Sequence, residues 1–240
     1  GALRARARLR CGGEAAVPAV RPPPRHDIPG DYRAAGVLFF SCDADGEVAR
    51  VLLGVEERKV SLKELDEGSG SARRQVLLFP QGKREDVDAT WVDTARREFV
   101  EETGDPGGLA ARLEPSAEAG ALPAAWYQFA KMAVVFCEVP EGEATWPAPP
   151  SDAARAELPL RAVWVDASEL RRVLLLPSGG EAVRTGLGDF ALFPVSRRFL
   201  QTAGVQRWLG VRAAPAAHRR RPASPPQAAG HPRRATARHA

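Results

Sequence analysis

Residues 82–104 read GKREDVDATWVDTARREFVEETG, and they carry the strongest signal in the chain. Three glutamates in this stretch, Glu98, Glu101 and Glu102, have the spacing i, i+3 and i+4. On a helix these positions share one face about one turn apart. Like charges so close repel one another, so a purely structural helix gains nothing from them. Carboxylate oxygens bind hard divalent cations such as Mg²⁺, and the spacing therefore predicts a metal site on a helix.

The same stretch shows the apolar spacing of an amphipathic helix. Val92, Ala95 and Phe99 recur at i, i+3 and i+7, which predicts a face packed against a sheet. We expect the helix over about residues 89–103, with Asp88 as its N-cap and Gly104 at its C-terminal end. The alternative interpretation is an Arg- and Glu-rich surface helix whose charges only face solvent.

This stretch resembles the Nudix box. The family pattern is Gly, five residues, Glu, seven residues, then Arg-Glu-apolar-x-Glu-Glu-x-Gly-apolar. Gly82 matches the opening glycine and follows a strand-like segment at residues 76–80. The fixed positions of the second half are matched by Arg97, Glu98, Phe99, Glu101, Glu102 and Gly104. The chain is thus similar to Nudix hydrolases in this box, and more loosely over residues 32–209.

The match has three departures from the family pattern. Asp88 stands where the first Glu is expected, eight residues rather than seven separate it from Arg97, and Asp105 replaces the final apolar residue. In the family the first Glu is a supporting residue near the arginine. The departures therefore concern the salt bridge of Arg97 more than the metal ligands.

The resemblance implies an enzyme that acts on acid anhydrides. A Nudix-type pyrophosphohydrolase cleaves the pyrophosphate bond of a nucleoside diphosphate linked to another moiety, with Mg²⁺ or Mn²⁺ as cofactor. By this resemblance, Glu98, Glu101 and Glu102 are the metal ligands, with one of them or a loop carboxylate as the general base. The carbonyl of Gly82 is a further candidate ligand, because a glycine lets the backbone approach closely.

Three more residues of the box receive candidate roles from the resemblance. Arg97 is expected to orient the glutamates through a bidentate pair, which makes it part of the catalytic set. Lys83 and Arg84 are candidates for contacting substrate phosphate, although charges on such loops more commonly face solvent. The expected partner is a small-molecule nucleotide, and no residue outside the box indicates which one.

Two other functions fit the same residues. A catalytically weak Nudix-fold module that binds a nucleotide or a protein is compatible with the altered first half of the box, whereas the intact glutamates argue against it. An RNA-cap hydrolase is the second alternative, in which basic tails grip RNA. A dependence of activity on those tails would discriminate it.

The charge distribution divides the chain into a domain and two ends. The formal net charge is +4, but residues 1–26 carry +5 and residues 211–240 carry +7, which leaves −8 for residues 27–210. We predict a Nudix-like domain over 27–210 between disordered basic segments at 1–26 and 211–240. The acidic domain is a poor match for duplex nucleic acid. RNA binding by the tails is not favoured, because their Arg, Ala and Pro content fits a general compositional bias.

Histidine and cysteine usage excludes several classes of enzyme. All four histidines lie outside residues 27–210, which argues against Ser-His or Cys-His catalysis and against His-ligated zinc. The three cysteines form no CxxC pair and fit a reducing compartment. We therefore expect an intracellular protein, in the cytoplasm or, given the Arg-rich transit-peptide-like start, in an organelle. No apolar run has the length of a membrane span.

The order of apolar segments predicts an α+β protein. We expect an α/β/α sandwich, as in the Nudix fold, with a mixed β-sheet, the box helix and a C-terminal helix. Residues 61–74 are expected to form a polar loop. The expected strands are 34–40, 48–55, 76–79, 126–139 and 161–165, and the other helices begin near 167 and span about 196–209.

Overall fold

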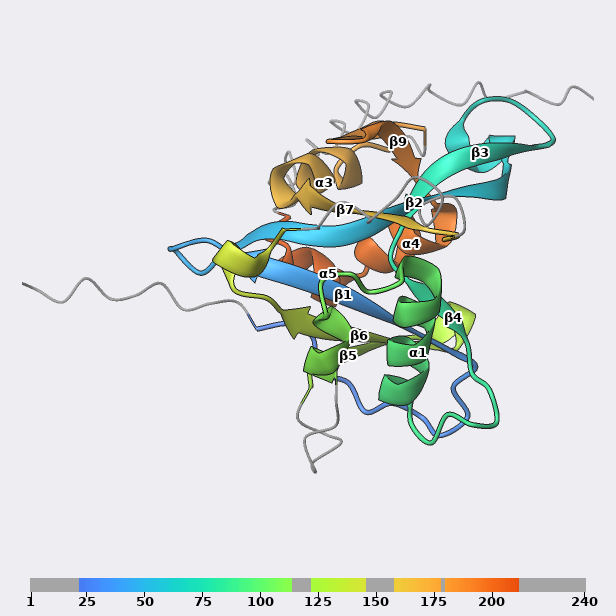
Figure 1. Ribbon diagram of the computed structural model, residues 1–240. Coiled ribbons are helices and arrows are strands. Elements are labelled where there is room, and N and C mark those ends of the chain that lie inside the picture. Colours follow the sequence, from blue (N-terminus) through green and yellow to red (C-terminus); the bar gives the residue numbers. More distant parts are fainter. Residues whose placement is uncertain (1–21, 114–121, 146–157, 178–179, 212–240) are drawn as a thin grey trace, which may run out of the picture.

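The computed structural model describes residues 22–113, 122–145, 158–177 and 180–211 (Figure 1). Most of the two predicted basic ends therefore lies outside the described residues, and the domain boundaries stay a prediction. Residues 25 to 28 follow the edge of the sheet, where the backbone N–H of His26 donates to the carbonyl of Ala124 at 2.8 Å. In the described part of the chain, no helix is long and apolar enough to cross a membrane.

One mixed sheet organises the described residues. Its strands lie in the order β5-β6-β1-β2-β3-β9-β8, with β4 paired to β1 and β7 paired to β2. The strands are β1 (Ala34–Cys42), β2 (Val48–Ser61), β3 (Ser71–Leu78), β4 (Gln81–Lys83), β5 (Ala124–Tyr127), β6 (Met132–Glu138), β7 (Arg161–Asp166), β8 (Ala182–Thr185) and β9 (Gly188–Leu192).

Strand β1 lies at the centre because it is apolar on both faces. All of its residues between Ala35 and Ser41 are buried, as expected for a strand covered on both sides. It runs parallel to β6, with Ala34 opposite Met132, and antiparallel to β2. The short β4 pairs with the start of β1, where Ala35 faces Gly82. This pairing fixes the glycine loop at one end of the sheet.

Helices cover both faces of the sheet, as the expected α/β/α sandwich requires (Figure 1). On one face α1 (Trp91–Thr103) packs Phe99 against Phe39, with ring centroids 4.9 Å apart. On the other face α5 (Ala203–Trp208) packs Trp208 against Phe40 and Phe136. The remaining helices of that face are α3 (Ala167–Leu174) and α4 (Pro194–Leu200). The expected α+β class is confirmed.

The polar loop expected at 61–74 is wrong in its extent. Residue 61 belongs to β2 and residues 71–74 belong to β3, and the two strands pair from Gly54–Leu78 to Ser61–Ser71. Only the 3₁₀ turn η1 (Leu62–Leu65) and residues 66–70 connect them. The strands were missed because their outward positions are charged, while ladder hydrogen bonds and the burial of Val60 support them.

Two expected single elements are each divided in the structure. Residues 126–139 form the antiparallel pair β5 and β6, joined by the 3₁₀ turn η3 (Gln128–Ala130), because Lys131 adopts a left-handed φ of 47° that reverses the chain. The helix expected at 196–209 is α4 followed by α5, because Thr202 has extended backbone angles and starts the second helix. The hairpin β8–β9 had no clear sequence signal.

Candidate functional site

Helix α1 has a start that differs from the expected one. Thr90, not Asp88, is the N-cap: its hydroxyl accepts from the N–H of Asp93, whose carboxylate accepts from the N–H of Thr90 at 2.8 Å. This reciprocal pair satisfies two free N–H groups of the first turn. The end is as expected, since Gly104 has a left-handed φ of 69° and its N–H donates to the carbonyl of Val100.

Asp88 holds Arg97 instead of capping the helix. The guanidinium donates from Nε to Oδ1 at 3.1 Å and from Nη2 to Oδ2 at 2.9 Å. Oδ2 also accepts from the N–H of Glu85 and the hydroxyl of Thr94. The hydrogen bond with Arg97 is the main reason that the pKa of the buried Asp88 falls to about 2. The extra residue of the box thus lies before the helix and leaves the salt bridge intact.

Arg97 connects this aspartate to two of the three glutamates. Its Nη1 donates to Oε1 of Glu98 at 2.9 Å and to Oε2 of Glu101 at 3.0 Å. Its Nη2 also donates to the carbonyl of Lys83 at 2.8 Å, which ties the helix to the glycine loop. One guanidinium therefore fixes the positions of both carboxylates relative to that loop.

Gly82 leaves the space that the carboxylate of Glu98 fills. A Cβ atom added to Gly82 would lie 1.9 Å from the Cδ atom of Glu98, so the carboxylate would have to move away. Burial, together with the nearby charges of Glu101 and Glu85, raises the pKa of Glu98 against the opposing effect of Arg97. The glycine loop is therefore shaped around this carboxylate.

Glu102 is the most buried of the three glutamates, with 8% of its surface exposed. Its Oε2 accepts from the backbone N–H of Gln81 at 3.0 Å. Burial is the main cause that raises its pKa to about 7, and the negative charges of Glu56 and Glu98 add to the effect. Burial and neighbouring negative charges destabilise the ionised form of such a carboxyl group. A cation bound next to it would stabilise that form.

Two residues of β2 belong to this site and were missed in the sequence. Nη2 of Arg58 lies 3.8 Å from Oε1 of Glu102 and 2.8 Å from Oε2 of Glu56. Both residues stand on a strand that was expected to end at residue 55. The alternation of Glu56, Arg58 and the buried Val60 was the available signal.

The donor set fits a divalent cation by its chemistry. Glu98, Glu101 and Glu102 carry oxygen atoms of the hard kind that Mg²⁺ and Mn²⁺ prefer, and they share one face of α1. Among the described residues, no three Asp, Glu, His or Cys side chains stand close enough together to enclose an ion. Arg97 and Arg58 hold the carboxylates in ion pairs instead.

Lys83 and Arg84, the two residues expected to contact substrate phosphate, have different surroundings. The guanidinium of Arg84 lies 4.5 Å over the ring of Tyr32 and donates to the carbonyl of Gly30 at 3.0 Å. These contacts hold it against the segment before β1. Lys83 is exposed next to Gly82, so of the two its ammonium is the freer to reach a ligand.

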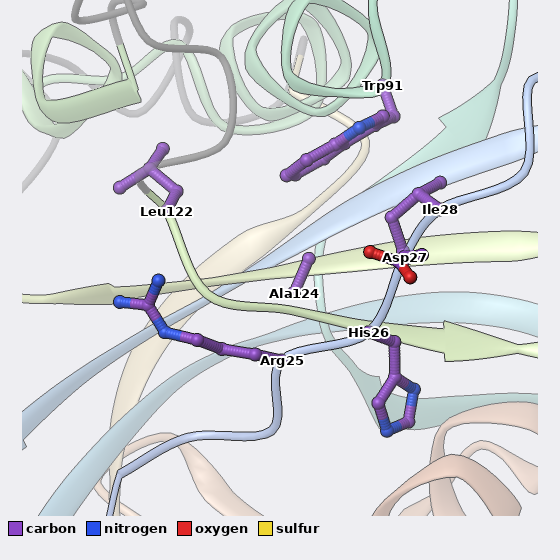
Figure 2. Close-up of a pocket in the computed structure, with 7 residues that line it drawn as sticks. All are labelled: Arg25, His26, Asp27, Ile28, Trp91, Leu122 and Ala124. Atoms are coloured by element: carbon purple, nitrogen blue, oxygen red, sulfur yellow. The ribbon is translucent and has the colours of Figure 1, made fainter.

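Two hollows lie beside α1. An open groove of about 560 Å³ reaches Asp88, Arg97 and Glu101. A second cavity, of about 350 Å³, lies between Trp91 at the start of α1, residues 25–28 and the beginning of β5, and Figure 2 shows the ring of His26 turned away from Trp91. Nδ1 of His26 instead accepts from the N–H of Trp126 at 3.0 Å. None of the three glutamates lines this cavity.

The comparison with protein families agrees with the box. The family model of the NUDIX domain matches residues 31–184, which is more than half of the chain. A crystal structure of a mutT/nudix family protein from Listeria innocua is similar at 15% identity and a TM-score of 0.30, covering 59% of this chain and 82% of that one. No curated protein matches the sequence significantly. On the family match, the chain belongs to the Nudix family, whose members hydrolyse nucleoside diphosphate derivatives.

Proposed function

We propose that this Nudix protein hydrolyses the pyrophosphate bond of a nucleoside diphosphate linked to another moiety, with Mg²⁺ or Mn²⁺ as cofactor. The observation that supports the proposal best is the Asp88–Arg97 pair, because Arg97 also holds Glu98 and Glu101 and donates to the carbonyl of Lys83 next to Gly82.

Glu98, Glu101 and Glu102 would hold the cation. When bound, it supplies activation of the attacking water and neutralises charge that develops on the pyrophosphate. The chain contributes the fixed position of each carboxylate: Arg97 orients two of them, and the N–H of Gln81 orients Glu102. Positions fixed before the reaction reduce the reorganisation that the chemical step requires.

The experiment is a hydrolysis screen of the full chain over a set of nucleotides, each with Mg²⁺, with Mn²⁺ and with EDTA. The set includes ADP-ribose, dinucleoside polyphosphates, oxidised nucleoside triphosphates and capped RNA. We expect turnover of at least one compound in either cation and none in EDTA. Turnover in EDTA would reject the metal-dependent mechanism, and ligand binding without turnover of any compound would favour the binding module.

A further inference from the structure

The distal half of the β2–β3 hairpin forms a two-stranded arm. Strand β7 pairs with β2 only as far as Val55, and β9 pairs with β3 only at Val76 and Leu77. Residues 56–61 and 71–75 therefore pair only with each other, and Figure 1 shows the hairpin extending past β7. The arm begins beside the site, because Glu56 and Arg58 lie next to Glu102.

Positive charges oppose one another directly across this arm. Arg58 pairs with Arg74, and Lys59 pairs with Arg73 in the strand register. Like charges in directly opposite positions destabilise a sheet. The two strands of the arm carry a net charge of +2 over residues 56–61 and 71–75, whereas the connecting residues 62–70 carry −2. The excess positive charge is therefore concentrated on the strands.

The two pairs lie on opposite faces of the arm. Side chains alternate along a strand, so Arg58, Arg74 and the buried Val60 share one face. That face is the one turned to the site, since Arg58 lies 3.8 Å from Glu102. Arg73 and Lys59 share the other face, where Arg73 pairs with Glu57.

The site-facing pair has donors that can take another acceptor. Nε of Arg58 is buried and has no hydrogen-bond partner among the described residues. Arg74 donates from Nε and Nη2 to Glu67 at 3.3 Å and from Nη1 to the carbonyl of Arg73 at 3.2 Å, so a phosphate group would replace these long hydrogen bonds of a side chain that is 47% exposed. Directly opposed side chains lie about 5 Å apart at Cβ, which lets one phosphate group accept from both guanidinium groups.

We propose that Arg58 and Arg74 form a phosphate-binding site for a phosphate group of the substrate outside the scissile pyrophosphate. The inference rests on the proposed function, and it deepens that function to nucleotides that carry an additional phosphate. Guanidinium groups suit this ligand because their planar donors match phosphate oxygens in pairs. The contact of Arg58 with Glu102 places this phosphate next to the carboxylates that act on the pyrophosphate.

The test uses matched compounds that differ by one phosphate, such as NADPH with NADH and coenzyme A with its 3′-dephospho form. For the full chain we expect kcat/KM to favour the phosphorylated member of a pair by about tenfold or more. Arg58→Gln and Arg74→Gln should each lower that preference about tenfold, mainly through KM, because a remote phosphate contact is the same in the ground and transition states. Arg58→Lys should restore part of it.

The matched control is Arg73→Gln, which removes an arginine of the same strand on the opposite face. It should leave the preference unchanged. An equal effect of Arg73→Gln and Arg74→Gln would show a general charge effect and overturn the proposal, as would a preference that Arg58→Gln and Arg74→Gln leave intact.

A binding measurement separates this proposal from the proposed hydrolysis. Calorimetric titration of the full chain with inorganic tripolyphosphate, in EDTA, needs no turnover. If Arg74→Gln weakens this binding about tenfold and Arg73→Gln does not, the phosphate site stands even when the chain hydrolyses no compound. Equal binding by the wild type and both variants would reject the site, whatever the hydrolysis screen shows.

Discussion

Asp88 and Arg97 are joined by two hydrogen bonds, and this pair links the loop before α1 to the glutamates on the helix. Asp88 is 4% exposed, so its charge is compensated almost entirely within the protein. The aspartate therefore takes the supporting position that the family pattern gives to glutamate. The added residue lies before the helix, so Asp88 still reaches Arg97 despite its shorter side chain.

Asp88→Ala should destabilise the protein and slow the reaction. Removing Asp88 from this buried ion pair deprives Arg97 of its bidentate partner and costs about 3 kcal/mol of unfolding free energy. Loss of this support should also lower kcat/KM about tenfold to a hundredfold. Chemical unfolding and steady-state rates measure both effects, with the exposed Asp86→Ala as the control. A variant as stable and as active as the wild type would contradict the role of the pair.

This stabilisation should persist into acid. The hydrogen bonds from Arg97 lower the pKa of Asp88 to about 2, below its value in the unfolded chain. Its contribution is therefore complete above about pH 4 and is lost as the pH falls through about 2. Unfolding measured from pH 2 to 6 should show a smaller acid-induced loss in Asp88→Ala than in the wild type.

Glu101→Gln and Glu102→Gln should each lower kcat by about a hundredfold or more while the fold remains intact. Each removes an anionic oxygen ligand and so weakens cation binding and charge neutralisation. Rates with Mg²⁺ and Mn²⁺ and circular dichroism would be measured together, with the exposed Glu141→Gln as control. Wild-type activity in Glu102→Gln would contradict the metal-dependent mechanism.

Gly82→Ala should impair the site more than the fold. The new methyl group would meet the carboxylate of Glu98 at 1.9 Å and displace it, and the end of a flexible side chain moves at little cost. We expect kcat to fall about tenfold or more, because misplacing a catalytic group by about 1 Å typically causes losses of that order. Gly30→Ala is the control, since a Cβ there meets nothing within 4 Å. A similar loss in both variants would point to a general effect on the loop.

Cation binding should weaken in acid because a proton competes for Glu102. Burial raises the pKa of this carboxyl to about 7, so its ionised form predominates only above that pH. Between about pH 5 and 7 the apparent affinity for Mn²⁺ should fall by up to tenfold per pH unit, and it should level off at higher pH. Electron paramagnetic resonance of free Mn²⁺ would measure it. Glu102→Gln should bind weakly and lose this pH dependence.

Without cations, the raised pKa of Glu102 makes the folded protein less stable as the pH rises. The folded state keeps the proton of Glu102 up to about pH 7, whereas the unfolded chain releases it near the ordinary glutamate value. This carboxyl therefore lowers the free energy of unfolding as the pH rises between those two values. Unfolding in EDTA should show that decrease in the wild type and not in Glu102→Gln.

A chain shortened to residues 22–211 should fold and hydrolyse a small nucleotide with kcat/KM within a few-fold of the full chain. It retains the proposed ligands and the contact of His26 with Ala124. On RNA, any contribution of the basic tails should appear as affinity that falls steeply with salt, because arginines displace counterions from phosphates. Lost activity on the small substrate would show that one of the removed segments completes the site.

The sequence by itself determined the features that depend on local spacing. The buried strand β1, the apolar stripe from Val92 to Phe99, the end of α1 at Gly104 and the shared face of the three glutamates all follow from short periodic patterns. Each depends on the geometry of one element, so neighbouring residues suffice to predict it. The family model matches residues 31–184, which include all of them.

The tertiary structure alone decided which residues meet across elements. Asp88 binds Arg97 rather than capping the helix because Thr90, two residues further on, forms a reciprocal cap with Asp93. Arg58 reaches Glu102 only because β2 continues past the end of β7 and pairs with β3 in a register that turns this side chain toward α1. Strand register is set by burial and pairing over the whole sheet, and no local pattern at Arg58 encodes it.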